Sequence, residues 1–381
     1  METKSISKVA LFPLLFGFFV MGFVDVVGIA TNYVKKDFLL SDTLANLIPM
    51  MVFLWFAVCS VPTGMLMRKI GKKNTVEAAL AVTFLAMLLP LFAYNFTVVL
   101  LAFALLGIGN TMLQVALNPM VASVVSSDKI TSILTLGQFL KAVSSFLGPL
   151  IAGAAASVWG NWKLIFIVYA VTTLLSALWL MFAVRNTEDG GTKKTSLATV
   201  LSLFKDSYIL MLFMGILLVV GIDVGLNTTI PKILMEKLGM ELSEAGLGTS
   251  LYFSARTIGA FVGAFVLAKV ASNVFLKYSM AIAVLAFFGL FWADGLWMLG
   301  AMIVVLGLAC ANVFSILFSY ALQHRPQQDN EISALMIMGV SGGALVTPLM
   351  GVLSDAFNQT TSLLLLLLCL VYLGYVSFHL K

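Results

Sequence analysis

Four charged side chains lie deep inside apolar stretches of the sequence, where charge is costly. Asp25 and Asp223 are acidic, Lys141 and Arg256 are basic, and none lies near the end of its stretch. An ionised side chain at the centre of a bilayer costs about 3 kcal/mol on insertion scales. Such residues predict function, and a carboxylate at this depth can bind a proton or a sodium ion on its way across the membrane.

Amide, hydroxyl and aromatic side chains recur at helical spacing in the same stretches. Residues four apart share one face of a helix, and amides and hydroxyls both donate and accept hydrogen bonds, as a neutral sugar requires. The alternative is hydrogen bonding between membrane helices, which is the commoner role of a lone Ser or Thr. The candidate substrate-binding residues are Asn32, Trp55, Asn110, Gln114, Asn118, Gln138, Asn227, Tyr252, Asn312 and Ser315.

The apolar stretches themselves are long enough to cross a bilayer as helices. The chain of 381 residues is 61% hydrophobic and only 10% charged, too little charge for the surface of a soluble domain of this length. About 20 apolar residues span the hydrocarbon layer as a helix, whereas a membrane β-barrel has short alternating strands. We therefore predict an all-α integral membrane protein with twelve transmembrane helices. The predicted helices are 9–33, 43–68, 74–94, 97–126, 130–156, 163–184, 208–235, 243–270, 275–292, 295–321, 331–356 and 360–380.

Lysine and arginine are distributed unevenly between the two ends of these helices. With both termini inside, fifteen lie on the cytoplasmic side and five outside, and the remaining two of the 22 are Lys141 and Arg256. Cytoplasmic loops carry the excess of positive charge in membrane proteins. We expect a protein of the bacterial inner membrane with both termini in the cytoplasm. The external set includes Lys35, Lys36 and Lys232.

The two halves of the chain align at a nearly constant offset. Asp25 corresponds to Asp223, an offset of 198, and Pro149 to Pro348, an offset of 199. The stretch between the halves is polar and contains a glycine pair, as a linker does. Parallel repeats of six helices with a site near the bilayer midplane are a plan of secondary transporters. We predict two pseudo-symmetric six-helix bundles at 1–184 and 208–381, joined by a cytoplasmic linker at 185–207.

Three segments carry a resemblance to a known family. Residues 62–74 (PTGMLMRKIGKKN) are similar to the loop between helices 2 and 3 of the major facilitator superfamily, although Arg68 stands where that loop usually has aspartate. Residues 107–124 and 307–323 resemble the fucose–proton symporter branch, which includes bacterial glucose/galactose transporters. The Asn118-Pro119 pair and the run from Asn312 to Ser315 are the marks of that branch. The resemblance covers essentially the whole chain.

The resemblance implies which intramembrane charges are neighbours, because it assigns helices 1 and 5 to one bundle and helices 7 and 8 to the other. On this basis we hypothesise that Asp25 neighbours Lys141 and that Asp223 neighbours Arg256. The pairs are either static, or one carboxylate takes up the coupling ion and releases its partner. A pair costs less in a low dielectric than either charge alone.

The sequence departs from the branch at the residues that the resemblance implies for coupling. The branch's helix 1 acid lies about one turn after Asp25, near Ile29, and Gln114 occupies the position of its helix 4 glutamate. A glutamine cannot carry a proton. Two ions therefore stay open: a proton at Asp25, or sodium at Asp25 and Gln114 with further oxygens from Thr31 and Asn32.

These features predict a transporter and not an enzyme. We expect cation-coupled import of a small neutral sugar, a hexose or deoxyhexose. The alternative is proton-coupled efflux of drug-like compounds, for which residues 146–153 carry a partial Gly-Pro signature, but the amide stripes weigh against it. The chain lacks a nucleotide-binding loop and metal-ligand spacing, so we expect no cofactor. The expected partners are the sugar, the coupling cation and the lipid bilayer, with no nucleic acid, and the expected state is a monomer.

Overall fold

The computed structural model describes residues 8–124, 130–184, 197–267, 269–325 and 328–380. Twelve helices in this part of the chain are long and apolar enough to cross a membrane, from Leu11–Phe38 to Gln359–His379. Each corresponds to one of the predicted spans, because runs of this length can satisfy their backbone groups in lipid only as helices. The predicted all-α membrane fold is confirmed.

The chain divides into two compact units that do not simply follow its two halves. Residues 27–57 pack with the C-terminal half, although the chain on both sides of this segment belongs to the N-terminal unit. The predicted division by a linker at 185–207 stays a prediction, since most of that linker lies outside the described residues. Unit 1 comprises Met1–Val26 and Val58–Lys194, and unit 2 comprises Val27–Ala57 and Thr195–Lys381.

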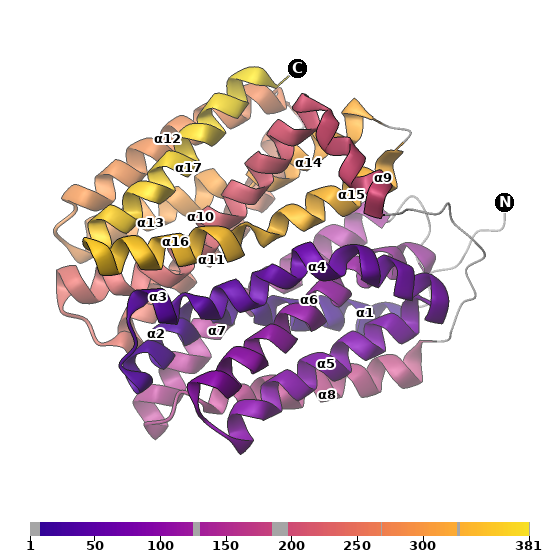
Figure 1. The fold of residues 1–381 in the computed structure, drawn as a ribbon, viewed down its shortest axis with the longest axis horizontal. Coiled ribbons are helices and arrows are strands. Elements are labelled where there is room, and N and C mark those ends of the chain that lie inside the picture. The colour runs from indigo at the N-terminus through magenta and orange to yellow at the C-terminus, as the bar shows by residue number, and fades with distance from the viewer. Residues whose placement is uncertain (1–7, 125–129, 185–196, 268, 326–327, 381) are drawn as a thin grey trace. The chain divides into compact units, whose positions relative to one another are not determined.

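Unit 1 is built around its first helix. Helix α1 packs against α6, α7 and α8, and α5 packs between α6 and α8 (Figure 1). Phe23 stacks on Tyr169 of α8 with ring centroids 3.7 Å apart, which anchors the segment after α1. The elements of unit 1 are α1 (Lys8–Met21), η1 (Gly22–Val26), the second part of α4 (Leu47–Ile70), α5 (Lys72–Phe92), α6 (Phe96–Val124), α7 (Ile130–Trp159) and α8 (Leu164–Ala183).

Unit 2 is centred on the long helix α10. This helix contacts α2, α11, α14, α16 and α17, while α3 packs on α16 and α12 contacts both α13 and α17 (Figure 1). The elements of unit 2 are α2 (Val27–Phe38), α3 (Asp42–Ala45), the first part of α4, α9 (Leu197–Ser202), η2 (Leu203–Lys205), α10 (Ser207–Leu238), α11 (Leu242–Leu267), α12 (Ser272–Trp292), α13 (Leu296–Cys310), α14 (Val313–His324), α15 (Asp329–Met338), η4 (Gly339–Ser341), α16 (Gly342–Ala356) and α17 (Gln359–His379).

Some membrane spans are interrupted, and the interruptions do not follow the sequence repeat. The first span changes to a 3-10 turn at Gly22–Val26, which contains Asp25. Its counterpart in the second half, α10, is unbroken over 32 residues and contains Asp223. A 3-10 segment inside a helix often marks a hinge. The two sequence-related aspartates therefore occupy different backbone environments.

The start of α10 is tied to the end of α14 by Asp206. Its Oδ1 accepts bonds from the backbone N–H groups of Tyr208 and Ile209, at 3.0 and 3.4 Å, as a helix N-cap. Its Oδ2 accepts from Arg325 Nη2 at 2.6 Å and lies 3.0 Å from His324 Nε2. Partial burial raises the pKa of Asp206, but the bonds from Arg325, His324 and the backbone outweigh it and lower the pKa to about 2.

Two substitutions of Asp206 separate the helix cap from the ion pair. Because its pKa lies below the ordinary value, the contribution of Asp206 to stability is present at neutral pH and is lost as the pH falls towards 2. At pH 7 we expect both Asp206→Asn and Asp206→Ala to lower the melting temperature. Alanine should cost about 1 kcal/mol more, because asparagine still caps the helix. Thermal denaturation in detergent measures both, and equal melting temperatures for the two variants would contradict the cap.

Candidate functional site

Asp25 lies in the 3-10 turn that interrupts the first span, directly against α7. The Ser145 hydroxyl donates to Asp25 Oδ2 at 2.5 Å. A side chain at Gly22 would overlap the carbonyl oxygen of Lys141 and the side chain of Ser144, so the two backbones touch. Helices 1 and 5 are therefore neighbours at the depth expected from the sequence. The pairing of Asp25 with Lys141 itself stays a prediction.

The predicted stripe on α6 forms a connected chain of hydrogen bonds. Asn118 Nδ2 donates to the Gln114 carbonyl at 3.2 Å, and Gln114 Nε2 donates to Asn110 Oδ1 at 3.0 Å. Asn110 Nδ2 then donates to the Met21 carbonyl at 2.6 Å. This carbonyl lies at the end of α1, where the helix stops. The stripe is thus bonded to the turn that carries Asp25, and the amide chain satisfies a backbone group at the interruption.

Two acceptors on this stripe are available to a ligand. Within the described part of the chain, Gln114 Oε1 and Asn118 Oδ1 accept no hydrogen bond, and both side chains are half-buried. A sugar hydroxyl could donate to either oxygen. Gln138, the other candidate in unit 1, lies on α7 with an exposed side chain.

In unit 2 the hypothesised neighbours Asp223 and Arg256 form an ion pair. Arg256 Nη1 lies 3.0 Å from Asp223 Oδ2. The phenol of Tyr252, one turn before Arg256 on α11, donates to Asp223 Oδ1 at 2.6 Å. The side chains of Asp223 and Arg256 are 12% and 26% exposed, so the pair is largely withdrawn from water. Tyr252 was expected to contact substrate, but its hydroxyl is engaged by this pair and its side chain is fully buried.

Two of the candidate asparagines in unit 2 join helices, as in the alternative considered for the amide stripes. Asn32 Nδ2 donates to the Thr228 carbonyl at 3.0 Å and thereby joins α2 to α10. Asn312 Nδ2 donates to the Gly259 carbonyl at 2.8 Å and joins α11 to the turn between α13 and α14. Both contacts lie within unit 2, and their donor groups are at least partly used by the protein.

The remaining candidates of unit 2 lie on three different helices. Asn227 is buried on α10 beside Gly28 of α2. Trp55 is half-buried on α4, and within the described residues its indole N–H has no partner. Ser315 is exposed on α14. Thr31, considered for sodium, donates its hydroxyl to the Val27 carbonyl of its own helix at 2.6 Å.

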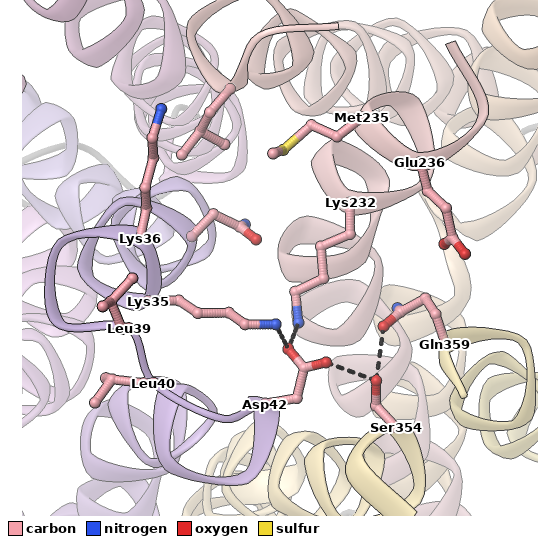
Figure 2. A pocket seen from close by; sticks show the side chains of 12 residues that line it. Lys35, Lys36, Leu39, Leu40, Asp42, Lys232, Met235, Glu236, Ser354 and Gln359 are labelled. Atoms are coloured by element: carbon pink, nitrogen blue, oxygen red, sulfur yellow. Dashed lines mark hydrogen bonds and ion pairs between the residues drawn. The ribbon is translucent and has the colours of Figure 1, made fainter. Parts of the chain in front are cut away.

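Sequence reasoning missed Asp42 at the start of α3, whose carboxylate bonds to side chains from three other helices. Its carboxylate accepts hydrogen bonds from Lys35, Lys232 and Ser354, and all four residues line a pocket of about 760 Å³ (Figure 2). The sequence contained one signal for this cluster. Acidic and basic residues occur together at the ends of the predicted membrane spans that are expected to face the outside. We call Lys35, Asp42, Lys232, Ser354 and Asp355 the Asp42 cluster. Across the described residues, no three His, Cys, Asp or Glu side chains come together as a metal site.

Comparisons with known proteins agree on the family and the fold. Residues 14–345 match the family model of the Major Facilitator Superfamily. A glucose/galactose transporter of Brucella abortus biovar 1 (strain 9-941) is 24% identical over 385 residues, which cover 96% of this chain and 92% of that protein. The fold is similar to that of the E. coli fucose:proton symporter, with a TM-score of 0.70 and 20% identity over 99% of this chain and 100% of that chain. A bacterial homologue of the human lysosomal transporter Spinster gives 0.78 at 16% identity, over 100% and 98%.

Substitutions at the Asp223–Arg256 pair test whether these charges depend on each other. Arg256→Met leaves Asp223 without its cation, and we expect a loss of roughly 3 kcal/mol of stability, the lower end for buried pairs. Asp223→Asn combined with Arg256→Met removes both charges and should be more stable than Arg256→Met alone. The measurement is the melting temperature of purified protein, with Ser254→Ala as control, because that hydroxyl bonds to Ser250 of its own helix. Additive losses would mean that the two charges do not interact.

Proposed function

The chain belongs to the Major Facilitator Superfamily, and from that premise we propose that it imports a small neutral sugar by cation-coupled symport. It is a transporter and an integral membrane protein, and its described residues contain twelve membrane-spanning helices. In our proposal the substrate is a hexose or deoxyhexose, the ion moves inward with it, and the protein lies in the inner membrane with both termini in the cytoplasm.

One observation carries the proposal: the amide stripe of α6 and the Asp25 turn are joined by hydrogen bonds. Asn110 bonds to the carbonyl at which α1 ends, and Gln114 bonds to Asn110. A sugar hydroxyl that donates to Gln114 or Asn118 would therefore change the row of hydrogen bonds that ends at the Met21 carbonyl, next to the turn that contains Asp25. Symport requires that sugar binding and ion binding influence each other, and this connection supplies a short physical route between them.

The coupling ion binds at Asp25 in this proposal. Protonation or a bound sodium ion neutralises the carboxylate, which lowers the cost of exposing it to an apolar environment as the carrier changes state. Ser145 adds a hydroxyl oxygen next to the carboxylate, and the turn itself departs from regular helix at membrane depth. Interrupted helices bind ions in this way in secondary transporters. Lys141, Asp223 and Arg256 belong to the same system as the charges that compensate the carboxylates when the ion leaves.

Two observations support a sugar as the substrate: the hydrogen-bonding groups on α6 and the name of a similar protein. The available groups on α6 are neutral amide oxygens, which suit hydroxyl donors better than a cationic or apolar drug. The Brucella abortus relative is named a glucose/galactose transporter and aligns along nearly the whole of both chains. Both observations favour sugar import over the efflux of drug-like compounds.

Asp25→Asn should uncouple the ion from the sugar without removing the sugar site. In proteoliposomes we expect the wild type to accumulate a labelled hexose when a proton or a sodium gradient is imposed separately. Asp25→Asn should retain counterflow, in which unlabelled internal sugar drives exchange, and should lose gradient-driven accumulation. The matched control is Asp294→Asn, which changes an exposed carboxylate in the loop between α12 and α13.

Two results would contradict the proposal. If none of a panel of hexoses and deoxyhexoses enters under either gradient, the substrate class is wrong, and gradient-driven extrusion of drug-like cations would then support efflux. If Asp25→Asn accumulates sugar as well as the wild type and the Asp294→Asn control, the ion binds elsewhere.

A further inference from the structure

The Asp42 cluster holds one carboxylate between two cations from different helices. Lys35 Nζ of α2 lies 2.6 Å from Asp42 Oδ1, and Lys232 Nζ of α10 lies 2.5 Å from the same oxygen. Ser354 of α16 donates to Oδ2 at 2.6 Å. In Figure 2 the two ammonium groups point at Asp42 from opposite walls of the pocket. Asp42 therefore joins α2, α10 and α16 at a single point.

The backbone of α3 is fastened to α16 as well. Asp355 Oδ1 accepts from the Asp42 N–H at 2.8 Å, and Oδ2 accepts from the Thr43 N–H at 2.7 Å. These are the orphan donors of a helix N-terminus, which favour a negative charge. A side chain at Gly351 would crowd the Asp42 carbonyl and Thr43, so α16 touches the backbone of this short helix. Both the side chain and the backbone at Asp42 thus bind the C-terminal half.

The segment that is held in this way continues into unit 1 at both ends. Residues 27–57 pack in unit 2, but α2 follows directly on the η1 turn, and α4 runs without a break across residues 57 and 58. In a carrier whose two bundles rock against each other, we infer that this segment moves with the N-terminal helices to which it is covalently joined at both ends, although it packs on unit 2 in the state described. Its contacts with α10 and α16 must then form in one state and separate in another.

The cluster has the character of a contact that can open. The pocket reaches it from solvent, and Lys35 is 33% exposed while Lys232 is 14% exposed. Water reaches the Lys35–Asp42 pair, which therefore contributes little net stability. The Lys232–Asp42 pair is more buried, so its two charges separate at small cost only when water enters between them. Without Asp42, however, two ammonium groups would face each other across the pocket and repel. The carboxylate therefore decides whether the two sides attract or repel.

We propose that the Asp42 cluster is a latch that closes the outer face of the transporter. It holds residues 27–57 on α10 and α16 in the state seen here and separates when that face opens. The proposal rests on transport by alternating states and on the orientation expected from the lysine and arginine distribution, and it is independent of which sugar or ion is carried. Loss of Asp42 should shift the protein towards the state that is open to the outside.

A cysteine beneath the latch reports whether the outer face is open. Thr228 lies one turn before Lys232 on α10 and is 1% exposed, and its hydroxyl bonds only within its own helix among the described contacts. The test uses Thr228→Cys in a protein whose three native cysteines are replaced, labelled on intact cells with a membrane-impermeant maleimide. We expect Asp42→Asn to raise the labelling rate by roughly fivefold, the effect of losing one modest contact in a two-state equilibrium.

Three comparisons make the result specific. Glu236→Gln removes another carboxylate of the same pocket and should leave labelling unchanged. Asp42→Asn combined with Lys232→Met removes the repulsion between the lysines, and labelling should return towards the starting rate. A cysteine at the fully buried Thr173 of α8 should stay unlabelled in every variant.

The opposite results overturn the latch. If Asp42→Asn lowers the melting temperature but leaves labelling at position 228 unchanged, the cluster is a permanent fastening. If labelling rises equally at position 173, the variant has loosened throughout and the effect is not local. No substrate is present in this assay, so its failure is distinguishable from failure of the proposed sugar transport.

Discussion

A polar group inside a bilayer needs a partner, and this requirement organises the structure described here. Asn110 donates a hydrogen bond to the Met21 carbonyl at the end of α1, and Asn312 donates one to the Gly259 carbonyl. Asp223 is held by a guanidinium and a phenol. Because hydrocarbon offers no alternative donor or acceptor, each such bond fixes which helices are neighbours. The same bonds then determine which movements are coupled.

The two aspartates illustrate how similar sequences acquire different roles. Asp223 lies on an unbroken helix with a cation and a phenol on its two oxygens, an arrangement suited to anchoring α10 on α11. Asp25 lies in a 3-10 turn, accepts a hydrogen bond from a serine, and is linked through the amides of α6 to the proposed sugar site. An internal repeat thus supplies two carboxylates, and tertiary contacts distinguish the one best placed for the ion.

The sequence was sufficient for the number and type of spans, because run length alone requires helix in lipid. It also indicated the neighbours Asp223 and Arg256 once the bundle of each helix was known. The interruption at Gly22–Val26 could not be predicted, because it depends on a residue distant in the sequence: Asn110 donates a hydrogen bond to the Met21 carbonyl at the end of α1. Asp42 was overlooked for a similar reason: hydropathy marks it as an end of a span, while its partners come from three separate parts of the chain.

Direct measurement of ion flux during sugar entry tests the central claim, that sugar and cation cross together. Proteoliposomes that contain a pH-sensitive dye receive external hexose without an imposed gradient, and parallel samples contain radiolabelled sodium outside. We expect the lumen to acidify, or labelled sodium to enter, in a fixed ratio to the sugar. Sugar entry with neither proton nor sodium movement would contradict the account.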